Sequence, residues 1–501
     1  MAKVDKAFGE GLVYQYASSA VFTLSGAIFY ILLVHSFPPD FVGSAALLIA
    51  IITLFPLLFT LGLQYGWQHF TSFALGRNTL NDVYTIKIYA LRTGVVLSTF
   101  SVLALFIVSK SLAVLFFHSS DFWIYIWAIS IVLPASIVSS FLNSIMLGLQ
   151  EFKKSGAIVI LYVLLTYALA TSLLYLKVSL YAIPISWGIG YAFGAILLFF
   201  ALPHEVQSIS HSSVDLMQIL RYSLPLYATG IITFSASYVD RFVVAAFKNL
   251  ADIGIYTIVL LLASGTALLS SPIGNVIFSK FSEFYATNDK AMIRFGVRHS
   301  INAASLLYVP AALGLASIAG PVLRFLTGPS YQQGTLPLVI LLVVNAIFVS
   351  VGPLTSALQG VRLTHVFLLS ASLSLLSNLV LSFILIPTFS LVGASIGLSS
   401  VSAVGFFITY AFSHKAKVAS FDLAMLSKIW ISSTIMASSV YALEWVTRFM
   451  ANLTPLYVAT GAFFYLILLK ATSTLSDADK LLLVRLLPRR LELLKALVDF
   501  L

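Results

Sequence analysis

The sequence predicts an all-α polytopic membrane protein with about fourteen transmembrane helices, arranged as two parallel six-helix repeats plus two C-terminal helices. The first observation behind this fold class is the composition: 60% of the 501 residues are hydrophobic, 9% are charged and the mean hydropathy is +1.01. A soluble domain is about 45–50% apolar and about 25% charged. The solvent of this chain must therefore be lipid, which excludes a soluble enzyme, a secreted disulfide scaffold and a nucleic-acid-binding domain.

The second observation is that apolar stretches recur along almost the whole chain. A transmembrane helix needs about 20 mostly apolar residues. Fourteen stretches meet this requirement, at 11–34, 41–66, 88–109, 122–148, 156–176, 180–202, 222–247, 253–274, 299–320, 333–358, 364–387, 391–413, 427–447 and 455–471. No connection between them is long enough to form a domain, and the basic N-terminus leads into a first span that we expect to be retained.

The third observation is the placement of the 28 Lys and Arg residues, which give a net charge of +10. With a cytoplasmic N-terminus and fourteen spans, 22 of them fall on the cytoplasmic side and 6 on the exterior side. Basic residues are retained on the cytoplasmic side during insertion. We therefore expect a multi-pass protein of the plasma membrane with both termini in the cytoplasm.

Shifting the chain against itself reveals a weak internal repeat. An offset of about 211 residues aligns Tyr16 with Tyr227 and Gly43 with Gly254, and an offset of 212 aligns Gly148 with Gly360. Six spans per repeat is an even number, so both copies insert with the same orientation. Parallel repeats are typical of transporters whose two lobes rock about a central site.

The repeat and the composition predict four segments. Residues 1–203 form a first lobe, residues 204–420 form a second lobe, and residues 421–475 hold two added helices. In residues 476–501 leucines are interleaved with Arg485, Arg489, Arg490 and Lys495, which resembles a basic amphipathic helix on the inner leaflet. A loosely held tail is the alternative for this last segment.

Polar residues inside apolar spans are costly in lipid and are therefore candidates for function. The seventh span carries Asp240 and Arg241, which project about 100° apart on a helix and need not pair with each other. They could couple ion movement and contact a substrate, or they could mark the exterior surface. Arg92 lies one turn into the third span, where it either lines a cavity or extends its charge to the interface.

Further polar groups lie at the ends of spans. Gln64, Gln68 and His69 end the second span, and Asn275 lies near their counterpart in the second repeat. They could line the inner mouth of a polar cavity or only cap helices. For Asn143, Asn302, Asn345 and Asn378 we expect hydrogen bonds between helices.

The sequence gives no sign of catalysis. It lacks cysteine, its eight histidines are scattered, and no metalloprotease, serine hydrolase or phosphate-loop motif is present. We expect no enzyme, no catalytic residue, no metal and no cofactor. Ion coupling through Na⁺ or H⁺ would need a carboxylate in the membrane, for which Asp240 and Glu444 are the candidates.

Four motifs resemble the polysaccharide and lipid-linked-oligosaccharide flippases of the multidrug/oligosaccharidyl-lipid/polysaccharide exporter superfamily, which are related to lipid II flippases. The segment YVDRFVVAAFKNLADIGIYTI matches their helix 7–8 turn through Asp240, Arg241, Gly254 and Tyr256. The segments IFSKFSEFYATNDK, LRFLTGPSYQQG and SNLVLSFILIPTFSLVGASIG resemble the connector after helix 8 and the helix 9–10 and 11–12 turns. The connector has Ser279 where proline is usual, and the first span lacks the arginines of the peptidoglycan-precursor branch, which argues against lipid II.

The resemblance implies a flippase that moves a polyprenyl-phosphate- or pyrophosphate-linked oligosaccharide by alternating access, with membrane lipids and glycan-assembly enzymes as partners. An anionic headgroup needs cations, for which Arg92, Arg241 and Arg298 are the candidates. Gln64, Gln68, His69 and Asn275 would add polar contacts. Two alternatives stay open: a drug or cation antiporter of the same fold, and a non-transporting membrane scaffold for glycan-assembly enzymes.

Overall fold

The computed structural model describes residues 2–77, 79–203, 215–267, 281, 289–361 and 363–474, and these residues are almost entirely helical, with no strand among them. Twelve of the described helices are long and apolar enough to cross a membrane. The sequence-based prediction of an all-α polytopic membrane protein is therefore confirmed. The predicted C-terminal amphipathic helix and Asn275 lie outside the described residues.

The predicted number of fourteen spans is compatible with these twelve helices, because one of them contains two spans and a shorter apolar helix corresponds to another. The long helix α16 (Thr364–Lys415) reverses direction at Ser390, where φ is 50° and ψ is −128°, so it contains the two predicted spans 364–387 and 391–413. Just after the turn, a Cβ on Gly393 would lie 2.5 Å from the carbonyl oxygen of Leu385, so only glycine fits there. The shorter apolar helix α10 (Leu250–Ala267) corresponds to the predicted eighth span.

The chain forms two compact units. The first comprises Met1–Ser235 and Ala245–Gly254, and the second comprises Ala236–Val244 and Ile255–Leu501. Besides part of α9 (Leu216–Phe247) and the start of α10, the helices of the first unit are α1 (Ala2–Ser36), α2 (Pro39–Phe59), α3 (Leu63–Gly76), α4 (Leu80–Phe117), α5 (Trp123–Ala128), α6 (Val132–Gly148), α7 (Phe152–Tyr175) and α8 (Ala182–Ala201). Those of the second unit are α12 (Lys290–Ser317), α13 (Ala319–Thr327), α14 (Thr335–Ile347), α15 (Val351–Gly360), α16, α17 (Leu423–Val446) and α18 (Thr454–Ala471), with the rest of α9 and α10. Short 3-10 turns, η1 (Ser120–Phe122), η2 (Ile129–Ile131), η3 (Ser179–Tyr181), η4 (Pro329–Gly334) and η5 (Ala451–Leu453), join several of them.

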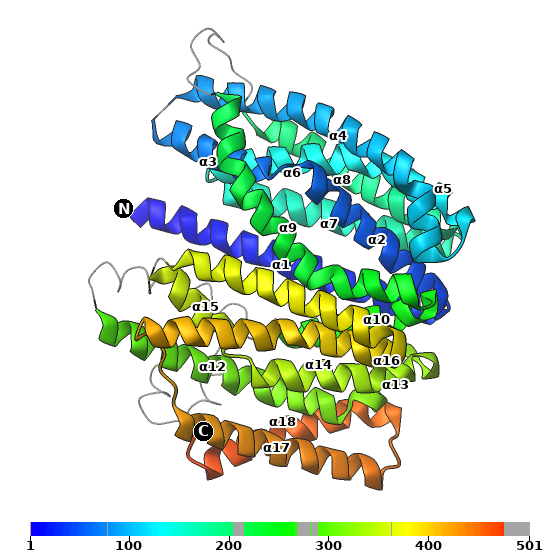
Figure 1. Ribbon diagram of the computed structural model, residues 1–501, viewed down its shortest axis with the longest axis vertical. Helices are drawn as coiled ribbons and strands as arrows, with labels where there is room; N and C mark the ends of the chain where they lie inside the picture. The colour runs from blue at the N-terminus through cyan, green and yellow to red at the C-terminus, as the bar shows by residue number, and fades with distance from the viewer. Residues whose placement is uncertain are drawn as a thin grey trace. The chain divides into compact units, whose positions relative to one another are not determined.

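Helix α6 is the centre of the first unit, because it packs against α3, α4 and α8 (Figure 1). Its residues Ile137, Phe141 and Ile145 are fully buried, and Phe141 meets the ring of Trp67 edge to face. Lys87 of α4 is also buried and donates hydrogen bonds to the carbonyl oxygens of Phe199 and Pro203, at 3.2 and 3.3 Å. Its charge thereby satisfies carbonyl groups at the end of α8.

The predicted second span, 41–66, is not one continuous helix. The structure ends α2 at Phe59 and begins α3 at Leu63, with Leu61 and Gly62 at φ values of 49° and 69°. Pro56 lies inside α2, one turn before this break, and its carbonyl oxygen still accepts the backbone N–H of Thr60 at 2.9 Å. Gln64, Gln68 and His69 therefore lie on α3 and not at the end of the preceding span.

The two repeat-related glycines pack against each other. A Cβ on Gly43 of α2 would lie 1.9 Å from the carbonyl oxygen of Leu250 and 2.9 Å from the nitrogen of Gly254. A Cβ on Gly254 would lie 2.2 Å from the carbonyl oxygen of Pro39. The backbones of α2 and α10 thus approach closely where both lack a side chain, as is common where membrane helices cross.

In the second unit, α12 packs against α14 and α17, and α16 packs against α14 and α15. The added helices α17 and α18 lie side by side (Figure 1). Tyr465 of α18 donates a hydrogen bond to the carbonyl oxygen of Leu306 in α12, at 3.0 Å, and so ties the added pair to the repeat.

Candidate functional site

The first candidate site is the charged pair of α9. Asp240 is fully buried, and its Oδ2 accepts a hydrogen bond of 2.6 Å from the hydroxyl of Tyr256 in α10. Its Oδ1 has no hydrogen-bond partner within the described part of the chain. Asp240 therefore does not mark a water-exposed surface, and one oxygen of its carboxylate is buried without a hydrogen-bond donor among the described residues.

The side chain of Arg241 contacts a different tyrosine from that of Asp240. Its guanidinium carbon lies 4.2 Å from the centre of the Tyr238 ring, in cation–π geometry, and its Nε has no hydrogen-bond partner among the described residues. The separation of adjacent side chains around a helix explains why the two charges find separate neighbours. The site thus holds a half-buried guanidinium next to a fully buried carboxylate.

A polar seam runs beside this pair in the second unit. Asn378 of α16 is fully buried, donates to the carbonyl oxygen of Ala236 in α9 at 3.0 Å, and accepts from the hydroxyl of Ser382 at 2.9 Å. Ala236 precedes Asp240 by one helical turn, so the seam lies on the same face of α9. The expected helix-to-helix hydrogen bond of Asn378 is confirmed.

The other expected asparagine contacts vary. Asn143 accepts from Ser155 at 2.8 Å and Asn345 accepts from Ser402 at 2.6 Å, and each bond joins two helices. The amide oxygen of Asn302 is buried and has no partner among the described residues.

The second candidate site is on α3. Gln68 and His69 are exposed, while Gln64 is half-buried and its Oε1 has no hydrogen-bond partner in the described structure. The His69 ring stacks on Tyr222 of α9, with ring centres 4.2 Å apart and planes tilted by 17°. The structure thus brings the three predicted residues together on one helix and adds Tyr222, whose exposed fraction is 40%.

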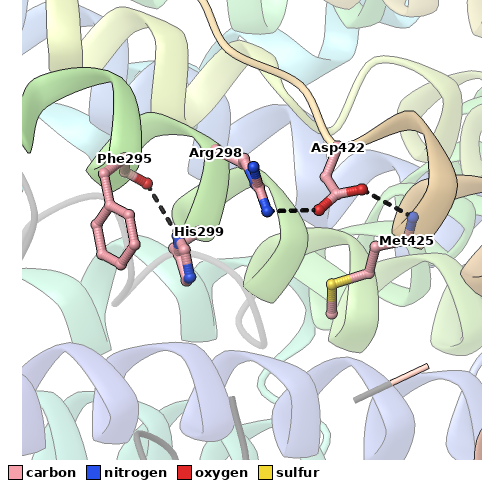
Figure 2. A network of polar contacts seen from close by, with 5 residues as sticks. All are labelled: Phe295, Arg298, His299, Asp422 and Met425. Carbon is pink, nitrogen blue, oxygen red and sulfur yellow. Dashed lines mark hydrogen bonds and ion pairs between the residues drawn. The ribbon is translucent and has the colours of Figure 1, made fainter. Parts of the chain in front are cut away.

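Arg298 of α12 lies elsewhere in the second unit and has a partner of its own. Its Nη2 is 3.0 Å from Oδ2 of Asp422, and the same carboxylate accepts the backbone N–H of Met425 at 3.1 Å (Figure 2). Asp422 therefore caps the start of α17 while it pairs with Arg298. Beside them, His299 bonds the carbonyl oxygen of Phe295 at 3.0 Å (Figure 2).

Arg92 is exposed on α4, on the same face as Val95, Val96, Phe100 and Leu103, each of which is more than half exposed. This face is an apolar stripe of helical period, as expected where a helix meets lipid. The three arginines proposed for an anionic headgroup thus have different surroundings. Arg241 is next to buried polar groups, Arg298 is in an ion pair, and Arg92 is on an apolar surface.

Helix α17 contributes to two further features, a buried carboxylate and an apolar cavity. Glu444 of α17 is 1% exposed, and its Oε1 has no hydrogen-bond partner among the described residues. An apolar cavity of about 490 Å³ lies between α12, α17 and α18, with Pro310, Met436 and Gly461 in its lining. Within the described ranges, no three His, Asp or Glu side chains gather as metal ligands.

Sequence reasoning missed Tyr222 and Asp422, because their partners lie more than 100 residues away in the chain. The spacing of Tyr65 and His69, four residues apart next to two glutamines, is the one local signal that an aromatic surface exists on α3.

The chain is similar in sequence to a known protein family and to two archaeal membrane proteins. Residues 37–336 match the model of a family described as polysaccharide biosynthesis protein. The probable low-salt glycan biosynthesis flippase Agl15 of Haloferax volcanii is 22% identical over 229 residues, which cover 45% of this chain and 48% of that protein. An uncharacterized membrane protein of Methanocaldococcus jannaschii is 25% identical over 312 residues, 57% of this chain and 70% of that one. The match to the Haloferax protein therefore spans about half of that relative's length.

Two solved structures share the fold. The lipid II flippase MurJ, in an inward closed conformation, gives a TM-score of 0.73 at 15% identity, covering 91% of this chain and 98% of that chain. An inward-facing multidrug resistance MATE family transporter gives 0.66 at 15% identity, with 79% and 95% covered. The chain belongs to the polysaccharide biosynthesis protein family and has the fold of the multidrug/oligosaccharidyl-lipid/polysaccharide exporter superfamily.

Proposed function

We propose that this protein is a flippase that moves a polyprenyl-phosphate- or polyprenyl-pyrophosphate-linked oligosaccharide from the inner to the outer face of the plasma membrane. The family match over residues 37–336 supports a role in polysaccharide assembly, and the relative from Haloferax volcanii carries the name of a probable glycan biosynthesis flippase. The two repeats would alternate access to a polar path, as parallel-repeat transporters do.

The observation that carries the proposal is the charged pair inside α9. A guanidinium within an apolar helix is costly unless it has a task, and Arg241 keeps its Nε unpaired beside the buried carboxylate of Asp240. A guanidinium holds phosphate through a planar fork of N–H donors. We assign Arg241 to the headgroup phosphate, with Arg92 and Arg298 as further contacts, and Asp240 to coupling with Na⁺ or H⁺ or to positioning Arg241.

The lipid tail would stay in the apolar phase during transport. The cavity between α12, α17 and α18 supports this assignment, because about 490 Å³ of space lined by apolar side chains is open to a hydrocarbon chain. The two added helices would then guide the tail, while the polar headgroup crosses through the repeats.

A drug or cation antiporter of the same fold is the main rival. Among the described residues, the buried carboxylates are Asp82 at the first turn of α4, Asp240 and Glu444, so the first unit offers no carboxylate near the middle of a span. That distribution favours an anionic cargo over a cationic one. A scaffold that only recruits glycan-assembly enzymes would have no use for a buried carboxylate beside a half-buried guanidinium in α9.

The test is gene deletion in the source organism, with export of surface glycan and drug susceptibility measured side by side. The proposal expects lipid-linked glycan to accumulate on the inner face and surface glycan to be lost, with rescue by the wild type but not by Arg241→Ala at equal abundance. Hypersensitivity to cationic dyes with normal surface glycan would favour the antiporter. Rescue by Arg241→Ala together with Asp240→Asn would favour the scaffold.

A further inference from the structure

We propose that exposed aromatic and amide side chains beside the α3–α9 contact form a binding site for a pyranose ring of the transported glycan. The site consists of Tyr65, His69 and Tyr222, called here the aromatic cluster, together with Gln64 and Gln68. This inference rests on the proposed function and adds the sugar-binding part of the cargo site, separate from the cation that would hold phosphate.

The aromatic cluster presents flat apolar surface. The rings of His69 and Tyr222 stack with centres 4.2 Å apart, and both side chains are exposed. Tyr65 is 42% exposed and lies one helical turn before His69, so both rings occupy one face of α3. The axial C–H groups of a pyranose carry partial positive charge and pack well on the negative face of an aromatic ring.

The two glutamines supply the complementary polar contacts. Gln64 and Gln68 are one turn apart and adjoin Tyr65 and His69 on the same helix. An amide offers both donors and acceptors, which suits the hydroxyl groups around a sugar ring. The exposed Gln68 presents its amide to the surface beside the aromatic cluster, whereas the Oε1 atom of Gln64 is buried without a partner in the described structure.

The surrounding backbone holds these side chains in place. A Cβ on Gly66 would lie 2.4 Å from the hydroxyl oxygen of Ser223, and one on Gly62 would lie 2.8 Å from the Ser223 carbonyl oxygen, so α3 and α9 are in close contact. Tyr227 donates a hydrogen bond of 2.5 Å to the carbonyl oxygen of Leu58, which the break before α3 leaves free of a helical partner. A site on such a fixed pair of helices loses little entropy when it binds.

The competing explanation is an aromatic belt at the membrane interface, where tyrosines anchor helices. A belt needs neither the unpaired amide oxygen nor the face-to-face stack, and it does not discriminate between ligands. The two explanations therefore differ in whether a sugar without a lipid tail binds to the aromatic cluster.

The experiment is saturation-transfer NMR on the full-length protein in detergent, with glucose-1-phosphate, galactose-1-phosphate and N-acetylglucosamine-1-phosphate as probes and inorganic phosphate as competitor. We expect transfer to the ring C–H protons of at least one sugar phosphate. Tyr222→Ala and Tyr65→Ala should each weaken apparent affinity about threefold to tenfold, the size of one aromatic contact. Tyr222→Phe and Tyr65→Phe should bind like the wild type, because they keep the ring.

The matched control is Tyr441→Ala, which removes a tyrosine of α17 that is 54% exposed and distant in sequence. Equal loss in this variant, full competition by phosphate alone, or no transfer to any sugar from the wild type would overturn the proposal. Flipping of the lipid-linked glycan is measured on the same variants. Unchanged flipping per correctly inserted molecule in Tyr222→Ala would leave the flippase standing and reject the sugar site, whereas a wild type that does not flip would reject the function itself.

Discussion

Asp240 and Arg241 are neighbours in the chain, but their side chains take different partners. Asp240 accepts the Tyr256 hydroxyl in a fully buried position, whereas Arg241 lies over the ring of Tyr238. The sequence motif placed Tyr256 in the same pattern as the charged pair, and the structure explains the association by the hydrogen bond. A buried carboxylate is tolerated only when it has such donors.

Removal of the Tyr256 hydroxyl should lower the free energy of unfolding. Tyr256→Phe leaves the buried Asp240 without its hydrogen bond, and we expect a loss of about 1–3 kcal/mol of unfolding free energy. Thermal unfolding of the purified protein measures it, with the exposed Tyr441→Phe as control. Restored stability in the double variant Tyr256→Phe with Asp240→Asn would show that the cost is that of an unpaired carboxylate, and an unchanged melting temperature in Tyr256→Phe would contradict the prediction.

The three arginines should respond differently to substitution by lysine. If each contacts a phosphate, Arg→Ala at 92, 241 and 298 should lower apparent affinity roughly tenfold to a hundredfold, since a charge-assisted hydrogen bond is worth about 1.5–3 kcal/mol. Arg→Lys should recover part of the loss, because lysine supplies charge without the planar fork. Full transport by the triple Arg→Lys variant, with unchanged orientation, would leave these residues as topology determinants only.

The single-residue expectations came from local signals in the sequence. The cost of a charge in lipid identified Asp240 and Arg241, and amide groups inside spans identified Asn378. The Arg298–Asp422 ion pair joins α12 to the cap of α17 across more than 120 positions, and no local pattern carries that information. From the sequence alone, Arg298 was therefore interpreted as a substrate contact, and its ion pair with Asp422 was not predicted.

Helices α2 and α10 approach each other closely at two glycines of the internal repeat. Gly43 and Gly254, which the internal alignment pairs, each leave too little space for a methyl group. Hydropathy predicted the helices themselves, because a span is a long apolar segment. It did not predict the break at Leu61 and Gly62, since the stabilising Tyr227 hydrogen bond comes from α9.

A pair of glycine variants on α10 tests this packing. In Gly254→Ala the new Cβ would lie 2.2 Å from the carbonyl oxygen of Pro39, and we expect destabilisation of about 1–3 kcal/mol from overpacking. Gly265→Ala meets no atom within 4 Å and should stabilise the helix by about 0.5–1 kcal/mol. Thermal unfolding compares the two, and equal behaviour of both variants would show that the close contact does not constrain α10.

The charge distribution along the whole chain predicts its orientation in the membrane. The chain has no cysteine, so single cysteines can be introduced without a background. We expect cysteines at 119, 251 and 390 to react with an impermeant thiol reagent added outside intact cells, and those at 154, 288 and 416 to react only after permeabilisation. The reverse labelling pattern would refute the predicted topology.

Transport of a lipid-linked oligosaccharide can be measured as flipping in vesicles reconstituted with the purified protein. Fluorescently labelled lipid-linked oligosaccharide from the source organism is placed in both leaflets, and an impermeant quencher is added outside. We expect that vesicles with the wild type approach complete quenching, that Arg241→Ala slows the approach strongly, and that protein-free vesicles stop at the outer-leaflet fraction. A plateau at that fraction in vesicles that hold correctly folded wild-type protein would contradict this expectation.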